Sequence, residues 1–189
     1  MVDTSSWKNK KIAEMNELQN NISTLDFSRI KNLGNDVVRI LKDDKKIAFL
    51  GNGGSAAESM HIAAEFVSKC SKDHRPLNVI CLNESQSAIT AIANDYGFEY
   101  VFQRIVEAEL KKGDMLIALS TSGKSANVLN AINTALEIGV KVILWTGSNN
   151  VEIESVDIWS CSIDSTPRVQ EIHLIWGHLL AEYVELFFE

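Results

Sequence analysis

Proline is nearly absent from this chain: only Pro76 and Pro167 occur among its 189 residues. So few breaks favour helices and regular crossovers over a fold rich in loops. No apolar run approaches the roughly 18 residues that a membrane-spanning helix needs, so we expect no membrane segment. The first eleven residues are polar and contain lysine instead of an apolar core, which argues against a signal peptide.

Cysteine is also scarce. Cys70, Cys81 and Cys161 are widely spaced, and no Cys-x-x-Cys pair suggests a zinc or redox site. We therefore expect three reduced, partly buried thiols in a cytoplasmic protein.

Basic residues are outnumbered. Eighteen Lys and Arg stand against 25 Asp and Glu, which gives a formal net charge of −7. A chain this acidic has no general attraction for nucleic acid or for an anionic membrane, so we expect neither as a partner. An anionic substrate must therefore be held by a local site.

The remaining composition is that of a globular protein, with 46% hydrophobic and 23% charged residues. The length favours one domain spanning residues 1–189. Within it, residues 1–44 carry apolar side chains at helical spacing and predict two helices, with a turn at residues 23–26. The two apolar stripes are Ile12, Met15, Leu18 and Ile22, and then Ile30, Leu33, Val37, Ile40 and Leu41.

Beyond residue 44 the pattern changes to short apolar runs that alternate with helical segments. Continuous apolar runs suit strands buried on both faces of a parallel sheet. The alternation predicts an α/β fold: a doubly wound, five-stranded parallel sheet flanked by helices, with an N-terminal helical extension and a long C-terminal helix. The expected strands are 47–50, 79–82, 115–119, 140–145 and 158–163. The expected helices are 55–70, 87–111 with an interruption near 94–97, 125–138 and 168–188.

Ligands of such sheets bind beyond the carboxyl ends of the strands, where this chain places a loop rich in hydroxyls. The loop follows an apolar strand and opens a helix, whose free N–H groups and dipole favour an anion. Simple N-capping by Ser122 or Ser125 is the alternative, but one cap needs only one hydroxyl. We therefore favour phosphate binding. The loop residues are Ser120, Thr121, Ser122, Gly123, Lys124 and Ser125.

A second loop, Gly51-Asn52-Gly53-Gly54-Ser55, lies at another strand-to-helix junction. Its glycines allow close approach to a ligand and positive φ angles. It lacks the complete dinucleotide and Walker patterns, so a tight turn is an equally good interpretation of this loop alone. Together the two loops point to a small phosphorylated ligand.

The titratable residues lie on two helices. His61 and Glu65 are four residues apart, so they share one helix face and can ligate a metal, pair as acid and base, or form a simple surface pair. Because their neighbours are apolar, we expect this helix to be well buried. Gln170 and His178 lie about two turns apart on the C-terminal helix and could flank one site, from one chain or from a neighbour. The other two histidines are interpreted as structural: His173 as a satisfied core residue and His74 as a surface loop residue.

These residues, taken as an ordered set, resemble the phosphoheptose isomerase (sedoheptulose 7-phosphate isomerase) branch of the sugar isomerase, or SIS, domain superfamily. The resemblance runs from the first helix to the last. It is carried by the segments 51–55, 61–65, 75–76, 93–98, 120–128, 146–147 and 168–173.

The resemblance implies a SIS-type fold and the conversion of sedoheptulose 7-phosphate to D-glycero-D-manno-heptose 7-phosphate through an enediol, for bacterial surface heptose. It also implies a homotetramer with shared sites, in which the N-terminal helices pack, and one Zn²⁺ per subunit. Glu65 and His178 would be the catalytic proton-transfer pair. The implied zinc ligands are His61, Glu65, Gln170 and His178. The implied substrate-binding residues are Asn52, Gly53, Gly54, Ser55, Glu65, Asn94, Asp95, Ser120, Thr121, Ser122, Ser125 and Gln170.

Three positions depart from the family pattern. Pro167 stands where a polar residue is expected, Lys69 where arginine is common, and Lys124 where a neutral side chain is usual. Lys124 either adds attraction for phosphate or points to solvent. The alternative function is a non-catalytic phosphosugar-binding or replication-initiator-associating protein, which would lack the catalytic carboxylate. The presence of both Glu65 and His178 favours the isomerase.

Overall fold

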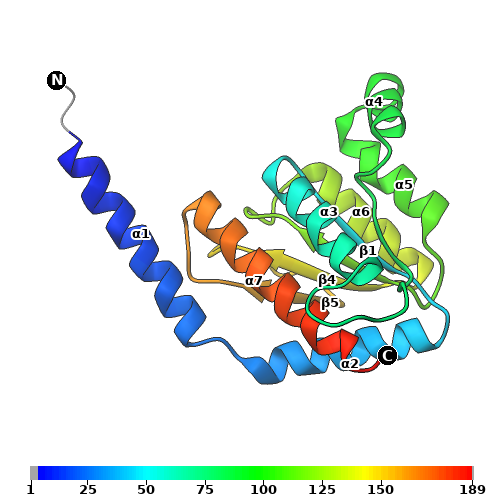
Figure 1. Ribbon diagram of the computed structural model, residues 1–189. Helices are drawn as coiled ribbons and strands as arrows, with labels where there is room; N and C mark the ends of the chain where they lie inside the picture. The colour runs from blue at the N-terminus through cyan, green and yellow to red at the C-terminus, as the bar shows by residue number, and fades with distance from the viewer. Residues whose placement is uncertain (1–3, 189) are drawn as a thin grey trace.

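The computed structural model describes residues 4–188 and contains one five-stranded parallel sheet, in the order β2-β1-β3-β4-β5 (Figure 1). The predicted fold class is therefore confirmed. The sheet separates two layers of helices, so each strand sends alternate side chains into two different cores. The strands are β1 (Ile47–Gly51), β2 (Val79–Cys81), β3 (Met115–Leu119), β4 (Lys141–Thr146) and β5 (Val156–Ser160).

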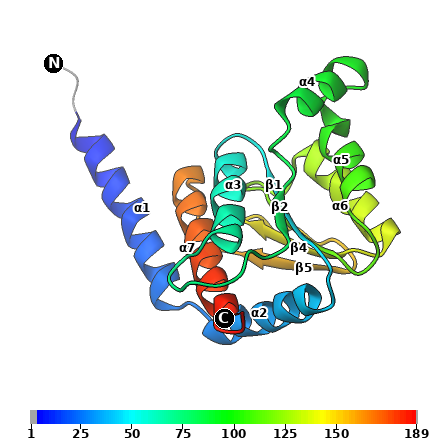
Figure 2. The same ribbon diagram turned by 45° about the vertical axis from the view of Figure 1, so that its right-hand side comes forward.

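The helices occupy both faces of the sheet, as Figures 1 and 2 show. Side chains of α2, α3 and α7 share one hydrophobic core with Phe49 and Trp145, whereas those of α5 and α6 share the other with Leu50 and Leu144. No helix of the described chain is long and apolar enough to cross a lipid bilayer. The helices are α1 (Ser5–Ser23), α2 (Phe27–Lys42), α3 (Gly54–Val67), α4 (Gln86–Asp95), the short 3₁₀ helix η1 (Phe98–Tyr100), α5 (Val101–Glu109), α6 (Ala126–Ile138) and α7 (Thr166–Glu185).

The N-terminal helices behave differently from each other. Asp26 caps α2 by accepting a hydrogen bond from the Ser28 N–H, as the turn chemistry predicted, and the apolar stripe of α2 is buried. In contrast, α1 projects from the body of the molecule (Figure 1), and its apolar residues Ile12 and Met15 are exposed.

Two sequence predictions about individual elements had different outcomes. The break in the helical segment 87–111 is confirmed, because α4 ends at Asp95 and Gly97 adopts a φ of 108° before the chain resumes as helix. The prediction of a fifth strand at 158–163, buried on both faces, is wrong. β5 ends at Ser160 and has only Trp159 fully buried, because it pairs only with β4 and forms an edge of the sheet. Pro167 lies in the first turn of α7, where proline is tolerated.

Helices α3 and α7 pack closely on the same face of the sheet. Gly177 makes this possible, because a Cβ atom there would lie 2.5 Å from side-chain atoms of Ile62. At the start of α3, a Cβ at Gly54 would lie 2.1 Å from the amide nitrogen of Gln170. The two helices therefore approach each other closely at two positions, each of which has a glycine on one of the helices.

Two of the buried ionisable side chains on α3 and α7, His173 and Glu58, make no hydrogen bond to residues 4–188. His173 is a core residue, as predicted, and burial lowers its pKa to about 4. The prediction that it is satisfied is wrong, because neither ring nitrogen has a hydrogen-bond partner among residues 4–188. The carboxyl oxygens of Glu58 likewise have no partner within that range, and burial raises the Glu58 pKa to about 7.

We predict that Gly177→Ala lowers the free energy of unfolding by about 1–3 kcal/mol, because the added methyl group overlaps Ile62. Urea unfolding measures the change. The double variant Gly177→Ala/Ile62→Ala serves as the control. Its loss of unfolding free energy should be smaller than the sum of the losses in the two single variants, because the overlap is gone. Additive effects would show that the two helices are not in contact here.

We predict that Glu58→Gln stabilises the protein at pH 8 and does so less at pH 5. The folded-state pKa of about 7 exceeds the reference value of 4.5. Between these pH values the folded protein keeps a proton on Glu58 that the unfolded chain has lost, so the free energy of unfolding falls as the pH rises from 4.5 to 7. At pH 8, removing the charge should raise the free energy of unfolding by at most about 3 kcal/mol. Unfolding at both pH values tests this, with Glu17→Gln on the exposed face of α1 as the control. Equal stability changes for Glu58→Gln at pH 5 and pH 8 would contradict it.

Candidate active site

The two predicted ligand loops lie at the carboxyl ends of β1 and β3, which are neighbours in the sheet. The chain leaves β1 toward β2 on one side, and β3 connects to β4 on the other, so the strand order reverses between them. Such a reversal opens a crevice outside the strand ends, and ligands of doubly wound sheets bind there. The fold therefore brings both predicted loops to one crevice, and ligand binding there stays a prediction.

A cavity of about 190 Å³ opens between these loops. This equals the volume of roughly six water molecules, which suits a phosphate group better than a whole sugar phosphate. Seven predicted substrate-binding residues line it together with Leu119 and Thr166. The lining residues are Asn52, Gly54, Ser55, Leu119, Ser120, Thr121, Ser125, Thr166 and Gln170.

The hydroxyl-rich loop presents its groups to this cavity. Ser125 is the N-cap residue of α6, yet in the described structure its side chain makes no capping hydrogen bond. Its hydroxyl instead lies 3.4 Å from that of Ser120. Ser122 accepts a local bond from the Lys124 N–H, and Gly123 adopts a φ of 64°. The hydroxyls of Ser120 and Ser125 and the N-terminus of α6 thus converge without being used for capping, which favours anion binding over simple capping.

The glycine loop is held in shape by contacts that the sequence did not reveal. Gly53 adopts a φ of 56°, which explains a glycine there. The Asn52 and Asn127 side chains exchange two amide hydrogen bonds of 2.8 and 2.9 Å. Asn83 likewise bonds both the N–H and the carbonyl of Gly51. Asn127 lies within the family-like segment 120–128, but its partner lies on a distant loop, so no local spacing predicts the pair.

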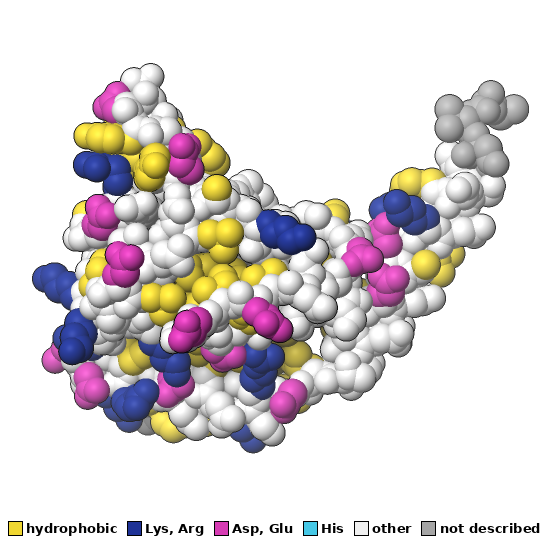
Figure 3. Space-filling model, turned by 180° about the vertical axis from the view of Figure 1, so that it is seen from behind, with side chains coloured by type: hydrophobic (Ala, Val, Ile, Leu, Met, Phe, Trp, Pro, Cys, Tyr) yellow, Lys and Arg dark blue, Asp and Glu magenta, His cyan; other side chains and the backbone are white. Residues whose placement is uncertain are grey.

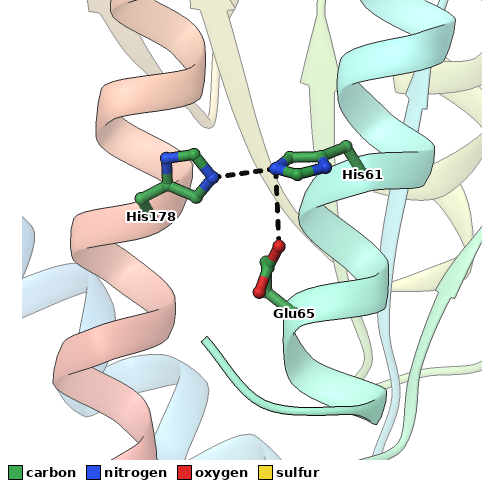
Figure 4. Close-up of side chains that lie close together, drawn as sticks. All are labelled: His61, Glu65 and His178. Atoms are coloured by element: carbon green, nitrogen blue, oxygen red, sulfur yellow. Dashed lines mark hydrogen bonds and ion pairs between the residues drawn. The ribbon is translucent and has the colours of Figure 1, made fainter. Parts of the chain in front are cut away.

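His61, Glu65 and His178 meet where α3 and α7 face each other (Figure 4), and this strip along the two helices is called the groove below. The Nε2 atoms of His61 and His178 are 2.8 Å apart, and the His61 Nε2 lies 3.4 Å from a Glu65 carboxylate oxygen. One ligand atom from each residue lies within 4.8 Å of the other two. The helical spacing placed His61 beside Glu65, and the packing of the helices adds His178.

This group can hold a proton or a cation. Two imidazole nitrogens that face each other must share a proton as donor and acceptor, or both present lone pairs to a metal. Two histidines and a carboxylate are a donor set typical of catalytic Zn²⁺ sites with an open position. His61 is half exposed, contrary to the expectation of a well-buried helix, whereas the Glu65 side chain is 19% exposed. The group is therefore accessible from solvent.

Gln170 lies at the other end of the groove. Its side chain packs against Gly54 and lines the phosphate-sized cavity, eight residues before His178 on α7. Eight residues of helix span about 12 Å. Within one subunit, the hydroxyls and Gln170 therefore lie about two turns of α7 away from the His61–Glu65–His178 group.

Several predicted residues lie elsewhere. Asn94 and Asp95 are exposed at the end of α4 and bond each other, away from the lining of the cavity (Figure 1). Lys69 and Lys124 are exposed. His74 lies in a loop, as predicted, and is partly exposed as a residue, but its side chain is only 1% exposed and faces Glu185.

The comparisons with known proteins agree with this geometry. The SIS domain family model matches residues 12–147. Phosphoheptose isomerase from Nitratiruptor is 46% identical over 150 residues, covering 78% of this chain and 80% of that protein. Phosphoheptose isomerase from Aquifex aeolicus is 42% identical over 151 residues, covering 79% of each.

Solved structures give the same result. A phosphoheptose isomerase from Neisseria gonorrhoeae superposes with a TM-score of 0.85 at 30% identity, covering 98% of this chain and all of that one. A phosphoheptose isomerase from Francisella tularensis shares the fold, with a TM-score of 0.88 at 24% identity over 98% of this chain and all of the other. The family match and the identity to these relatives show that the chain belongs to the SIS domain family, in its phosphoheptose isomerase branch.

Proposed function

We propose that the protein is an aldose–ketose isomerase that converts sedoheptulose 7-phosphate to D-glycero-D-manno-heptose 7-phosphate, for bacterial surface heptose. The observation that carries the proposal is the meeting of Glu65 and His178 about two turns of α7 away from the hydroxyl-rich cavity. A non-catalytic binding protein needs the cavity but has no use for the acid–base pair. The relatives named phosphoheptose isomerase support the same reaction.

The reaction moves a carbonyl group from C2 to C1. A base removes a proton from C1, which gives a cis-enediol. A proton then returns to C2, while the hydroxyl proton passes from O1 to O2. A carboxylate and an imidazole on two sides of the substrate can carry these protons. Glu65 on α3 and His178 on α7 face each other across the groove and suit these two roles.

The distant end of the groove would bind the phosphate. Ser120, Thr121 and Ser125 offer hydroxyls, and the N-terminus of α6 adds partial positive charge. The length of about 12 Å along α7 between the two ends is comparable to an extended seven-carbon sugar phosphate. Binding energy from the phosphate would thereby orient the reacting carbons, which are remote from it.

We also propose one Zn²⁺ per subunit, bound by His61, Glu65 and His178. The donor set and its spacing fit the ion. When bound, zinc would polarise the carbonyl and hydroxyl oxygens of the substrate. Gln170 stays a predicted fourth ligand, although its side chain lies at the phosphate end of the groove within one subunit.

A cytoplasmic homotetramer is the assembly that we propose. Trp7 and Met15 on the projecting α1 are 64% and 55% exposed, and Tyr96 and Phe98 are exposed at the opposite projection. Figure 3 shows hydrophobic side chains on both projections. Large exposed apolar side chains suggest contacts with further copies. Such contacts could also bring Asn94 and Asp95 to a neighbouring site, and the free cysteines suit a reducing compartment.

We predict that Glu65→Gln lowers kcat by at least about 10²-fold, because the amide cannot accept the proton. NMR of sedoheptulose 7-phosphate conversion measures the rate, and circular dichroism checks the fold. Glu137→Gln, on an exposed position of α6 away from the groove, should leave kcat unchanged. Near-normal turnover by Glu65→Gln would overturn the proposed mechanism.

We predict that Lys124→Gln raises KM for the sugar phosphate several-fold and leaves kcat within a factor of two. Lys124 adds a positive charge beside the hydroxyl loop of an otherwise acidic protein, so it should act on binding and not on proton transfer. The KM of the wild-type protein should also rise with salt more steeply than that of the variant. Equal KM values and salt slopes would show that Lys124 only faces solvent.

A further inference from the structure

The segment of residues 68–77, here the α3–β2 loop, follows α3 and packs on the C-terminal end of α7 (Figures 1 and 2). α3 carries Glu65 in its last turn, and α7 carries His178. The loop therefore continues the contact between the two helices beyond the point where α3 ends. Neither the cavity nor the His61–Glu65–His178 group includes its residues.

Glu185, the last residue of α7, holds this loop. Its carboxylate is buried and accepts hydrogen bonds from three successive backbone N–H groups. One oxygen accepts from Ser71 at 3.0 Å and from Lys72 at 3.0 Å, and the other from Cys70 at 3.3 Å and Ser71 at 3.2 Å. Hydrogen bonds to a charged acceptor are stronger than neutral ones, and truncating one partner leaves buried groups unsatisfied.

Further contacts keep the loop in place. The buried His74 ring contacts the Arg75 carbonyl through Nδ1 at 2.7 Å, and its Nε2 lies 3.9 Å from Glu185. The Arg75 guanidinium stacks over Phe188, just beyond α7. At its far end, the Leu77 N–H donates to the carbonyl of Phe66, next to Glu65. The loop is thus anchored both to α7 and to the last turn of α3.

The spacing along α7 connects this anchor to the acid–base pair. Glu185 and His178 are seven residues apart, which is almost two full turns, so both lie on the face of α7 that contacts α3 and its loop. The backbone from Glu65 to Cys70 is short. Phe66 keeps the last turn of α3 in the core, so release of the loop would remove the restraint that acts on the exposed side of this turn, where Glu65 lies.

We propose that Glu185 is a positioning residue, which fixes the end of α3 and thereby the Glu65 carboxylate against His178. Its effect on turnover rests on the proposed function, but its effect on the geometry of the groove does not. Proton transfer is sensitive to misplacement by about 1 Å, whereas the phosphate end of the groove lies far from the loop. Loss of Glu185 should therefore affect kcat and spare KM.

The test uses Glu185→Gln in the full chain, which keeps the size of the side chain and replaces one accepting oxygen by an amide group. Ser71→Ala is the matched control, because it removes only the hydroxyl that contacts Glu182 and retains the backbone N–H donors to Glu185. We expect Glu185→Gln to lower kcat at least tenfold with KM within threefold, and Ser71→Ala to match the wild type. In metal-free protein, imidazole NMR should show shifted His61 and His178 ring signals in Glu185→Gln only.

Unchanged kcat together with unchanged imidazole signals in Glu185→Gln would overturn the proposal, as would equal losses in kcat for Glu185→Gln and Ser71→Ala. If the wild-type protein itself fails to isomerise the sugar phosphate, the proposed function fails and the imidazole signals still decide the role of Glu185. Shifted signals would then support the positioning role, and unchanged signals would reject it.

Discussion

The close approach of α3 and α7 is the constraint on which the site depends. The missing side chains at Gly177 and Gly54 leave room for Ile62 and Gln170 on the opposite helix. The helices therefore pack without a layer of larger side chains between them. Only at this separation can His61 and Glu65 from one helix reach His178 from the other. Beyond the end of α3, the Glu185 carboxylate extends the same contact through the α3–β2 loop.

The sheet supplies the second requirement, a fixed position for the phosphate. The reversal of strand order places the ends of β1 and β3 side by side, and both following loops open there into helices. The Asn52–Asn127 pair holds these loops together, and the Asn83 side chain, just after β2, fixes Gly51 at the end of β1. The proposed binding site at the sheet end and the proposed proton-transfer pair between the helices are thus separated in space, and α7 connects them.

Much of this arrangement follows from sequence patterns of short range. Helical spacing placed His61 beside Glu65, and the alternation of strands and helices predicted that the glycine loop and the hydroxyl-rich loop both follow strand ends. Contacts of long range were not predictable: the burial of His74 depends on Glu185, more than a hundred residues away. The apolar run at 158–163 looked like a buried strand, because a sequence does not reveal that β5 is the edge of the sheet. The exposure of the α1 stripe is likewise decided by tertiary packing, not by its helical spacing.

The central claim is that the groove between α3 and α7 isomerises a seven-carbon sugar phosphate. NMR of sedoheptulose 7-phosphate incubated with the purified protein, with and without a chelator, tests it most directly. The account predicts signals of D-glycero-D-manno-heptose 7-phosphate, which chelation suppresses and added zinc restores. Absence of conversion even with added zinc would contradict it.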